Sequence, residues 1–420
     1  MTYIGENVEG LNDFVVYLSC KNQKLTGMRK NQLLCNPFNS LAVMGLMIGI
    51  IFSACNGHDR KARDAFRGFH DFDIKRGVNI SHWLSQSGRR GAEREAFFTR
   101  EDAEQIAGFG YDHIRLPIDE EQMWDEQGNK ETRAFELLHE AIGWALESDL
   151  RLIVDLHIIR SHHFNAPENP LWTERAEQLK FVDMWRQLSG ELKDYPLDMV
   201  AYELMNEAVA DDPADWNNLV AETMAALREL EPERKIVIGS NRWQSVNTFP
   251  DLVIPENDPH IILSFHFYEP FLLTHYRASW THIRDYTGPV NYPGLSVAQA
   301  DLEGLPESVV TAVGNHNRVY TKESMEEMIM IPIRYAMEHN LPLYCGEWGC
   351  LPTVDQPMRL QWYADVREIL EKHKIAWANW DYKGGFGVVD RQTGEPHTDL
   401  LQVLLPAEES NLEVLELLLR

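Results

Sequence analysis

Two glutamates in this 420-residue chain have surroundings that suit acid–base and nucleophilic chemistry. Glu207 ends the segment Tyr-Glu-Leu-Met-Asn-Glu, and Glu347 lies within Tyr-Cys-Gly-Glu-Trp-Gly. Each stands at the polar end of a short apolar run and precedes loop-like sequence. Two carboxyl groups on the same rim of a barrel are the minimum equipment for cleaving a glycosidic bond, one as the acid and the other as the nucleophile. This chemistry requires a fold that brings the two runs together.

From Arg76 onward, short apolar and β-branched runs alternate with longer segments of helical period. This alternation indicates repeated βα units and a parallel sheet. Eight strands close a barrel, so the pattern predicts an α/β protein with a single (β/α)8 TIM barrel. The expected strands are Lys75–Ile80, Tyr111–Ile118, Leu150–Ile158, Met199–Glu207, Arg234–Asn241, His260–Tyr268, Leu341–Gly349 and Ile375–Tyr382.

Six segments between these strands have apolar residues at three- and four-residue spacing and are expected to be helices. They are Thr99–Ala107, Arg133–Ser148, Thr173–Leu192, Pro213–Leu230, Lys322–His339 and Gln356–His373. The stretch from Glu269 to Tyr320 is too long for an ordinary loop and contains several aromatic residues, so it is interpreted as a functional insertion. The four aromatic residues that mark it are Tyr276, Trp280, Tyr286 and Tyr292. The catalytic domain is expected to span residues 67–405.

The active site of such a barrel lies at the carboxyl ends of its strands. Polar or aromatic residues end every expected strand. In chain order they are Asn79, Arg115, His157, Asn206, Glu207, Asn241, His266, Tyr268, Glu347 and Trp380. Taken singly, each is more often a structural residue than a functional one. Together on one rim they favour a site.

Seven motifs, in order, resemble those of glycoside hydrolase family 5, which contains many endo-β-1,4-glucanases. They are Gly77–Leu84, His113–Ile118, Val154–His157, Tyr202–Glu207, Ser264–Pro270, Gly346–Gly349 and Trp377–Gly387. The likeness covers nearly the whole chain after residue 70. It has two small departures: Trp348 stands where Phe is common, and Ala208 where Pro often follows the acid/base glutamate.

The resemblance implies a retaining double displacement with Glu207 as the general acid/base and Glu347 as the nucleophile. It also assigns roles around the sugar that is cleaved. Arg115 and Tyr268 would stabilise the charged nucleophile, Asn206 would contact the sugar 2-hydroxyl, His157 and His266 would position the sugar and Glu207, and Trp380 would form the floor on which the sugar stacks. Trp83 is expected to bind substrate in a flanking subsite, and Trp124, Trp172, Trp280 and Phe386 are further subsite candidates.

No metal or cofactor is expected. Cys345 and Cys350 are expected to be buried free thiols, because a separation of five residues along an extended chain is too long for a disulfide. A zinc site is disfavoured because no Cys/His cluster at ligand spacing accompanies them. His162 and His163 resemble a metal pair, but neighbouring residues on a strand face opposite ways, so a loop role is expected. Glu203 is interpreted as structural.

Residues 1–54 are interpreted as a targeting segment, with 28–54 as a lipoprotein-type signal. A basic start at 28–30 precedes an apolar run, Leu41 to Phe52, that is shorter than the roughly 20 residues needed to span a bilayer. Small residues then precede Cys55, which would carry the lipid. This predicts a lipid-anchored protein outside a bacterial cell; an uncleaved membrane anchor is the alternative. Residues 406–420 are expected to form a helical tail.

The formal net charge of −26 argues against a nucleic-acid partner. We expect a monomer that cleaves internal β-1,4 bonds of cellulose or mixed-linkage β-glucan. Within the same chemistry, a β-mannanase or xyloglucanase is the nearest alternative, because subsite loops decide which polymer fits. A non-catalytic glycan-binding surface lipoprotein and a metal-dependent barrel hydrolase remain further alternatives.

Overall fold

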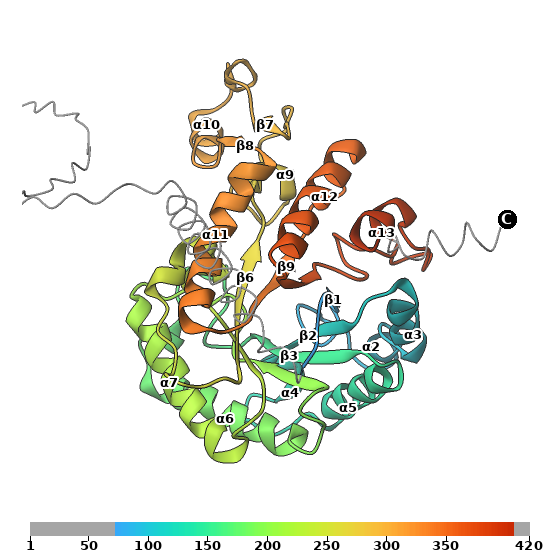
Figure 1. Cartoon of the computed structure of the whole chain (residues 1–420), viewed down its shortest axis with the longest axis vertical. Coiled ribbons are helices and arrows are strands. Elements are labelled where there is room, and N and C mark those ends of the chain that lie inside the picture. The colour runs from blue at the N-terminus through green and yellow to red at the C-terminus, as the bar shows by residue number, and fades with distance from the viewer. Residues whose placement is uncertain (1–71, 407–420) are drawn as a thin grey trace, which may run out of the picture. The chain divides into compact units, whose positions relative to one another are not determined.

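A closed barrel of eight parallel strands organises the computed structural model, which describes residues 72–406 (Figure 1). The order around the barrel is β1, β2, β3, β4, β5, β6, β9 and β10, and β10 pairs with β1 to close it. The strands are β1 (Arg76–Asn79), β2 (His113–Asp119), β3 (Arg151–Ile158), β4 (Val200–Glu203), β5 (Ile236–Gly239), β6 (Ile261–Phe267), β9 (Leu343–Trp348) and β10 (Ala376–Asn379). The predicted (β/α)8 fold is confirmed.

Long helices surround the barrel in Figure 1. They are α3 (Arg100–Phe109), α5 (Thr132–Glu147), α6 (Arg175–Leu192), α7 (Pro213–Leu230), α11 (Lys322–His339) and α12 (Gln356–Lys372). All six helices expected from the sequence are present. Helix α7 begins at Pro213 as predicted, and the Asp212 side chain accepts a hydrogen bond from the Ala214 N–H at 2.9 Å.

Short helical segments occupy several connections. They are α2 (Ala92–Glu95), α4 (Glu120–Met123), η2 (Pro170–Trp172), α8 (Asn241–Gln244), η3 (Val246–Asp251) and α13 (Thr398–Leu404). Of these, α8 is a tight turn and not a regular helix, because its backbone is left-handed at Arg242 and Trp243. None was predicted, since three to seven residues are too few for a helical period to show.

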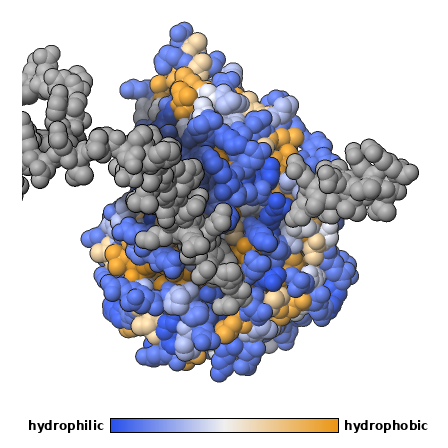
Figure 2. Space-filling model, in the orientation of Figure 1, coloured by the Kyte–Doolittle hydropathy of each residue, from blue (hydrophilic) through white to orange (hydrophobic). Residues whose placement is uncertain are grey.

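Apolar side chains from the strands pack in two directions, because successive residues of a strand face opposite sides. A small buried cluster, which includes Ile153, Ala201, Val237 and Ile262, is separate from the much larger core that also involves the helices. The barrel is therefore filled with side chains, and the site must lie at its end. The described surface visible in Figure 2 is mostly hydrophilic, as the acidic composition leads one to expect.

The insertion between β6 and α11 is a folded unit. It contains α9 (Phe271–Thr274), β7 (Gly294–Leu295), η4 (Gln299–Leu302), α10 (Glu307–Gly314) and β8 (Val319–Tyr320), and β7 pairs with β8 in antiparallel fashion. Figure 1 shows α10, β7 and β8 at the top, beyond α11. Tyr276, Tyr286 and Tyr292 are buried, whereas Trp280 is 56% exposed. Three of the four aromatic residues that marked the insertion are therefore packing residues.

The predicted signal, Cys55 and the tail after Pro406 lie outside the described residues. Within residues 72–406, no helix is long and apolar enough to cross a membrane.

Candidate active site

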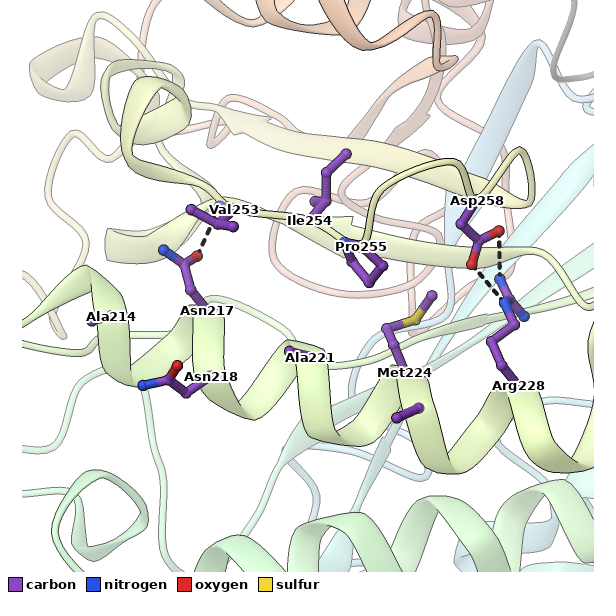
Figure 3. Close-up of a pocket in the computed structure, with 11 residues that line it drawn as sticks. Ala214, Asn217, Asn218, Ala221, Met224, Arg228, Val253, Ile254, Pro255 and Asp258 are labelled. Carbon is purple, nitrogen blue, oxygen red and sulfur yellow. Dashed lines mark hydrogen bonds and ion pairs between the residues drawn. The ribbon is translucent and has the colours of Figure 1, made fainter.

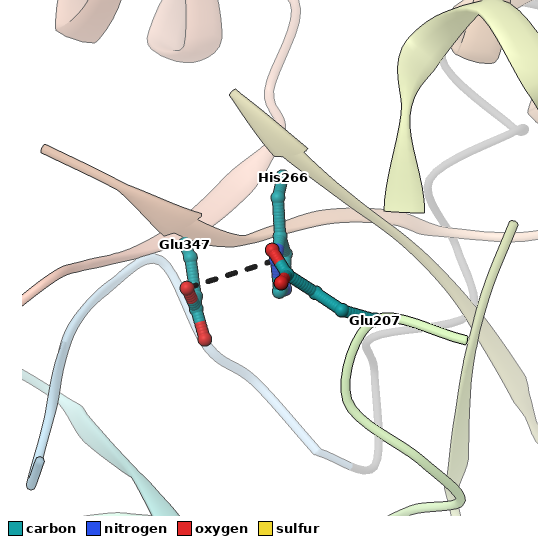
Figure 4. A group of neighbouring side chains, drawn as sticks. All are labelled: Glu207, His266 and Glu347. Carbon is teal, nitrogen blue, oxygen red and sulfur yellow. Dashed lines mark hydrogen bonds and ion pairs between the residues drawn. The ribbon is translucent and has the colours of Figure 1, made fainter. Parts of the chain in front are cut away.

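Glu207, His266 and Glu347 converge at the carboxyl end of the barrel (Figure 4). Glu347 lies on β9 and His266 on β6, where the two residues are register partners. One oxygen of Glu207 and one of Glu347 lie within 4.8 Å of each other. His266 Nδ1 is 2.9 Å from Glu207 Oε1 and 3.7 Å from Glu347 Oε2. The two glutamates singled out by the sequence therefore face each other.

Glu207 is not a strand residue. The expected strand Met199–Glu207 is too long at its end, because β4 stops at Glu203, where its pairing with β5 also stops. Glu207 has a left-handed backbone with φ of 47°. A non-glycine residue held in this region costs on the order of 1 kcal/mol or more, so surrounding contacts must hold it there.

Arg115 links the nucleophile candidate to the barrel interior. Its guanidinium is fully buried on β2 and donates from Nη1 to Glu347 Oε1 at 2.7 Å and from Nη2 to Asn206 Oδ1 at 2.9 Å. It also donates from Nε to Glu203 Oε2 at 2.6 Å. Glu203 is fully buried and serves to anchor Arg115, which agrees with its interpretation as structural.

The two glutamates differ in what opposes the effect of burial on their pKa values. Burial raises the pKa of Glu347, but the Arg115 guanidinium and the Tyr268 hydroxyl, which donates to Oε2 at 2.9 Å, stabilise the carboxylate and oppose that rise. Burial and the neighbouring charge of Glu347 raise the pKa of Glu207 well above its ordinary value. Of the two carboxyl groups, Glu207 is therefore the one whose neutral form its surroundings favour more strongly.

His157 and Trp380 lie together beside this pair. Their rings stack with centroids 5.6 Å apart and planes 9° apart. Burial lowers the pKa of His157 to about 3, so its ring is neutral at pH 7, and its Nδ1 lies 2.7 Å from Asp155 Oδ2. Trp380 also belongs to a small apolar cluster with Phe386. Trp380 therefore lies beside the carboxylate pair, and its role as a floor for the sugar stays a prediction.

Two residues from the strand-end inventory use their side-chain amides within the protein. Asn79 is fully buried and donates to the Gly346 carbonyl at 3.0 Å, and Asn241 exchanges hydrogen bonds with the backbone of Ala210. These contacts make both of them supporting residues of the site.

Trp83 is the clear correction. It was expected to bind substrate, but it has no exposed surface, its indole N–H donates to the Arg94 carbonyl at 2.7 Å, and its ring packs against Phe98. Trp124 is likewise buried at 2% exposure. An aromatic residue near a strand end gives no sign in the sequence of whether it faces the core or the solvent.

Gln244 and Asp155 were missed by the sequence analysis. The Gln244 side chain contacts the Glu207 backbone, and Asp155 orients His157. Asp155 lies two residues before His157 on the same strand, a spacing that could have flagged it. Gln244 follows three residues after Asn241 in an irregular turn, where no pattern points to it.

Glu207, His266 and Glu347 are also the group of described residues whose ligand-type atoms could hold a metal ion. The sequence showed no cluster of metal ligands, whereas the fold brings these three residues together, so the metal-dependent alternative needs a direct test. A cation at this position would bind the same carboxylates that retaining hydrolysis requires, and the two uses exclude each other.

A groove of about 480 Å³ lies elsewhere, along α7 (Figure 3). Residues of α7, among them Ala221 and Met224, form one side, and Val253, Ile254 and Pro255 form the other. None of the predicted site residues lines it. The groove is therefore separate from the carboxylate pair.

Residues 77–385 match the family described as cellulase (glycosyl hydrolase family 5). The chain belongs to this family. Among its relatives, Endoglucanase C of Acetivibrio thermocellus is 31% identical over 321 residues, covering 74% of this chain and 91% of the relative. Cellodextrinase A of Ruminococcus flavefaciens is 27% identical over 72% of this chain and 84% of its own length. A solved structure called endoglucanase is 25% identical, with a TM-score of 0.64, and covers 81% of this chain and 99% of its own. This family 5 member is a glycoside hydrolase.

Proposed function

We propose that this glycoside hydrolase cleaves internal β-1,4-glucosidic bonds of cellulose or mixed-linkage β-glucan with retention of configuration. Glu347 is the nucleophile and Glu207 the general acid/base. The observation that carries the proposal is the approach of the two buried carboxyl groups to within 4.8 Å at their nearest oxygens. Retaining enzymes hold their carboxyl groups about 5–5.5 Å apart, whereas inverting enzymes need about 6.5–9.5 Å to admit a water molecule.

In the first step, a Glu347 oxygen attacks the anomeric carbon while Glu207 gives its proton to the leaving oxygen. The glycosidic bond breaks, and a covalent sugar ester forms on Glu347. Arg115 and Tyr268 keep Glu347 ionised until the attack. The high pKa of Glu207, raised by burial and by the charge of Glu347, keeps its proton available.

In the second step, Glu207 takes a proton from water, and that water attacks the anomeric carbon and releases Glu347. The ester has no charge, so the repulsion that raised the pKa of Glu207 disappears at this stage. Two inversions at the same carbon give net retention.

The sugar would stack on Trp380, since a pyranose presents an apolar C–H face to an aromatic ring. Arg115 occupies the Asn206 Oδ1, which leaves the Asn206 amide N–H groups to donate to the sugar 2-hydroxyl. His266 holds the Glu207 carboxyl, and the His157 ring stacks against Trp380.

The choice of glucan follows the names of the relatives, several of which are endoglucanases. A Thermotoga maritima structure of the same fold, 23% identical, was solved with mannotriose, so β-mannanase or xyloglucanase activity is the alternative. The test is to profile by mass the products from defined β-linked oligosaccharides of glucose, mannose, xyloglucan and mixed linkage. Internal cleavage of β-1,4-glucans with β-anomeric first products is expected. Preferred cleavage of mannans would overturn the substrate, α-anomeric first products would overturn the mechanism, and binding without turnover would indicate a glycan receptor.

The metal-dependent alternative has a direct test. Hydrolysis should be unchanged after prolonged dialysis against a chelator, since the proposed steps use only carboxylates. Loss of activity that returns with a divalent cation would reassign the cluster of Glu207, His266 and Glu347.

We also propose that the enzyme acts as a monomer at the outer surface of a bacterial cell, anchored by lipid on Cys55. Support comes from the basic, apolar and small-residue order before Cys55 and from the polymeric substrate, which does not enter cells. A radioactive fatty acid should label the wild-type protein and should not label Cys55→Ala. The Cys55→Ala variant should also be absent from the membrane fraction.

A further inference from the structure

The turn after β5 has an unusual backbone. Arg242, Trp243 and Gln244 follow one another with φ values of 55°, 62° and 50°. Three consecutive non-glycine residues in the left-handed region are costly, and such strain persists only where surrounding contacts impose it. An observed outlier of this kind motivates a search for what the turn accomplishes.

The turn delivers the side chain of Gln244 into the barrel end. The side chain is 1% exposed, and both of its polar atoms are used. Its Oε1 accepts from the Glu207 N–H at 3.1 Å, and its Nε2 donates to Glu203 Oε1 at 3.2 Å and to Ser264 Oγ at 3.1 Å. The amide orientation is fixed chemically, because a backbone N–H only donates and a carboxylate only accepts.

Gly239 makes room for this side chain. A Cβ at that position would lie 2.3 Å from Gln244 Cγ and Nε2, well inside contact distance. The end of β5 therefore accommodates Gln244 through the lack of a side chain at residue 239.

The same turn holds the loop after Glu207 at two more points. Trp243 N–H donates to the Ala208 carbonyl at 3.3 Å, and Asn241 pairs with the Ala210 backbone in both directions at 2.9 Å. The loop that contains Glu207 is thus held by the turn after β5, and the Glu207 N–H donates to Gln244.

A continuous path joins the two glutamates behind the sugar site. It runs from the Glu207 backbone to Gln244, from Gln244 to Glu203, from Glu203 to Arg115, and from Arg115 to Glu347. All of its side chains are buried. One network therefore sets both the position of the acid/base and that of the nucleophile.

We propose that Gln244 is a positioning residue for the acid/base, which fixes the Glu207 backbone and hence the aim of its carboxyl at the leaving oxygen. The proposal rests on the function proposed for Glu207 and goes beyond it. A displacement of a catalytic group by about 1 Å can lower the reaction rate on the order of 100-fold. The loss should concern proton donation and not the attack by Glu347.

The test is Gln244→Met, which keeps the side-chain length and removes the three hydrogen bonds of the amide. Two substrates are compared: cellotetraose, whose leaving sugar needs the proton, and dinitrophenyl β-cellobioside, whose leaving group departs without it. We expect kcat on cellotetraose to fall about 10- to 100-fold with little change in KM, and the release of dinitrophenol in the first turnover to be nearly unchanged. Gln361→Met on α12, whose exposed amide donates to Asp365 Oδ1 at 3.0 Å, is the control for the same substitution away from the site.

An equal loss on both substrates, or a loss only in KM, would overturn the positioning role. Gly239→Ala provides a second variant, because its methyl group displaces Gln244 without altering it; the same selective loss is expected. Glu207→Gln measured in parallel separates the two proposals. If the rate loss in Glu207→Gln is the same for both leaving groups, the acid/base assignment fails. If the rate loss depends on the leaving group in Glu207→Gln but not in Gln244→Met, only the positioning role fails.

Discussion

The end of β9 and the loop after β4 hold their glutamates in different ways. Glu347 lies on a strand, and a guanidinium and a phenol bind its carboxylate directly. Glu207 lies on a strained loop, and its backbone is held by Gln244. Among residues 72–406, its carboxyl is hydrogen-bonded to the neutral ring of His266 alone. A group that must stay charged is given donors, and a group that must carry and release a proton is given burial and a nearby charge.

Removing the charged member should have the largest effect. Glu347→Gln deletes the nucleophile while keeping the shape, so kcat on cellotetraose should fall at least about 10⁴-fold. Oligosaccharide affinity, measured by calorimetry, should change little. Glu303→Gln, on the exposed part of the insertion, is the control. If Glu347→Gln turned over cellotetraose at a rate comparable to that of the wild type, Glu347 would not be the nucleophile, and the contrast between the two regions would fail.

Removing the proton carrier should have a smaller and more selective effect. Glu207→Gln should lower cellotetraose hydrolysis by about 10²- to 10⁴-fold. With dinitrophenyl β-cellobioside, stopped-flow measurements should instead show a rapid burst followed by slow turnover, because the second step still lacks its base. The absence of a burst would mean that Glu207 contributes to the attack itself.

Removing a hydrogen-bond donor from Glu347 should bring its pKa closer to that of Glu207. Tyr268→Phe removes a hydrogen bond that favours the charged form of Glu347, so its pKa should rise further above the ordinary value. Activity requires ionised Glu347, so the acidic limb of the kcat/KM profile should move to higher pH. The basic limb, which reports loss of the Glu207 proton, should move less. Tyr335→Phe, whose hydroxyl bonds to the Leu252 carbonyl, is the control; an acidic limb that stays in place would contradict the role of Tyr268.

The smallest catalytic effect is expected for a substitution at Trp83, which tests whether this residue packs in the core or binds substrate. Trp83→Phe loses a buried hydrogen bond to Arg94 and some volume, so the free energy of unfolding should fall by about 1–3 kcal/mol. The kcat of the folded enzyme should be unchanged. Urea unfolding and cellotetraose kinetics measured together decide this, and weaker oligosaccharide binding at unchanged stability would restore Trp83 to a subsite.

Much of the barrel was predictable because each strand and long helix has its own apolar period. All eight strands and six long helices were found, and so was the meeting of Glu207 with Glu347, because carboxyl ends of barrel strands share one rim. The end of β4 was misplaced because apolar sequence continues to Met205 after pairing has stopped at Glu203. Composition cannot report where a hydrogen-bonded ladder ends.

The supporting residues could not be predicted for a different reason. Gln244 is directed by three left-handed residues, Arg242 to Gln244, and none of these is the glycine or asparagine that usually marks such a backbone. Trp83 was misassigned because packing alone decides whether an indole faces a sugar or the core. Contacts between distant segments determine both outcomes.

Asn79 stands where the first strand of the barrel meets the last. Its amide donates to the Gly346 carbonyl on β9 at 3.0 Å, and its Oδ1 accepts from Arg115 Nη1 at 2.9 Å. The Asn79 side chain therefore contributes both to closing the barrel and, through Arg115, to positioning Glu347. A partly folded form in which β1 has detached would lose the Asn79 contact to Arg115 and would be inactive even if its helices were retained. Turnover therefore also reports whether the barrel is closed.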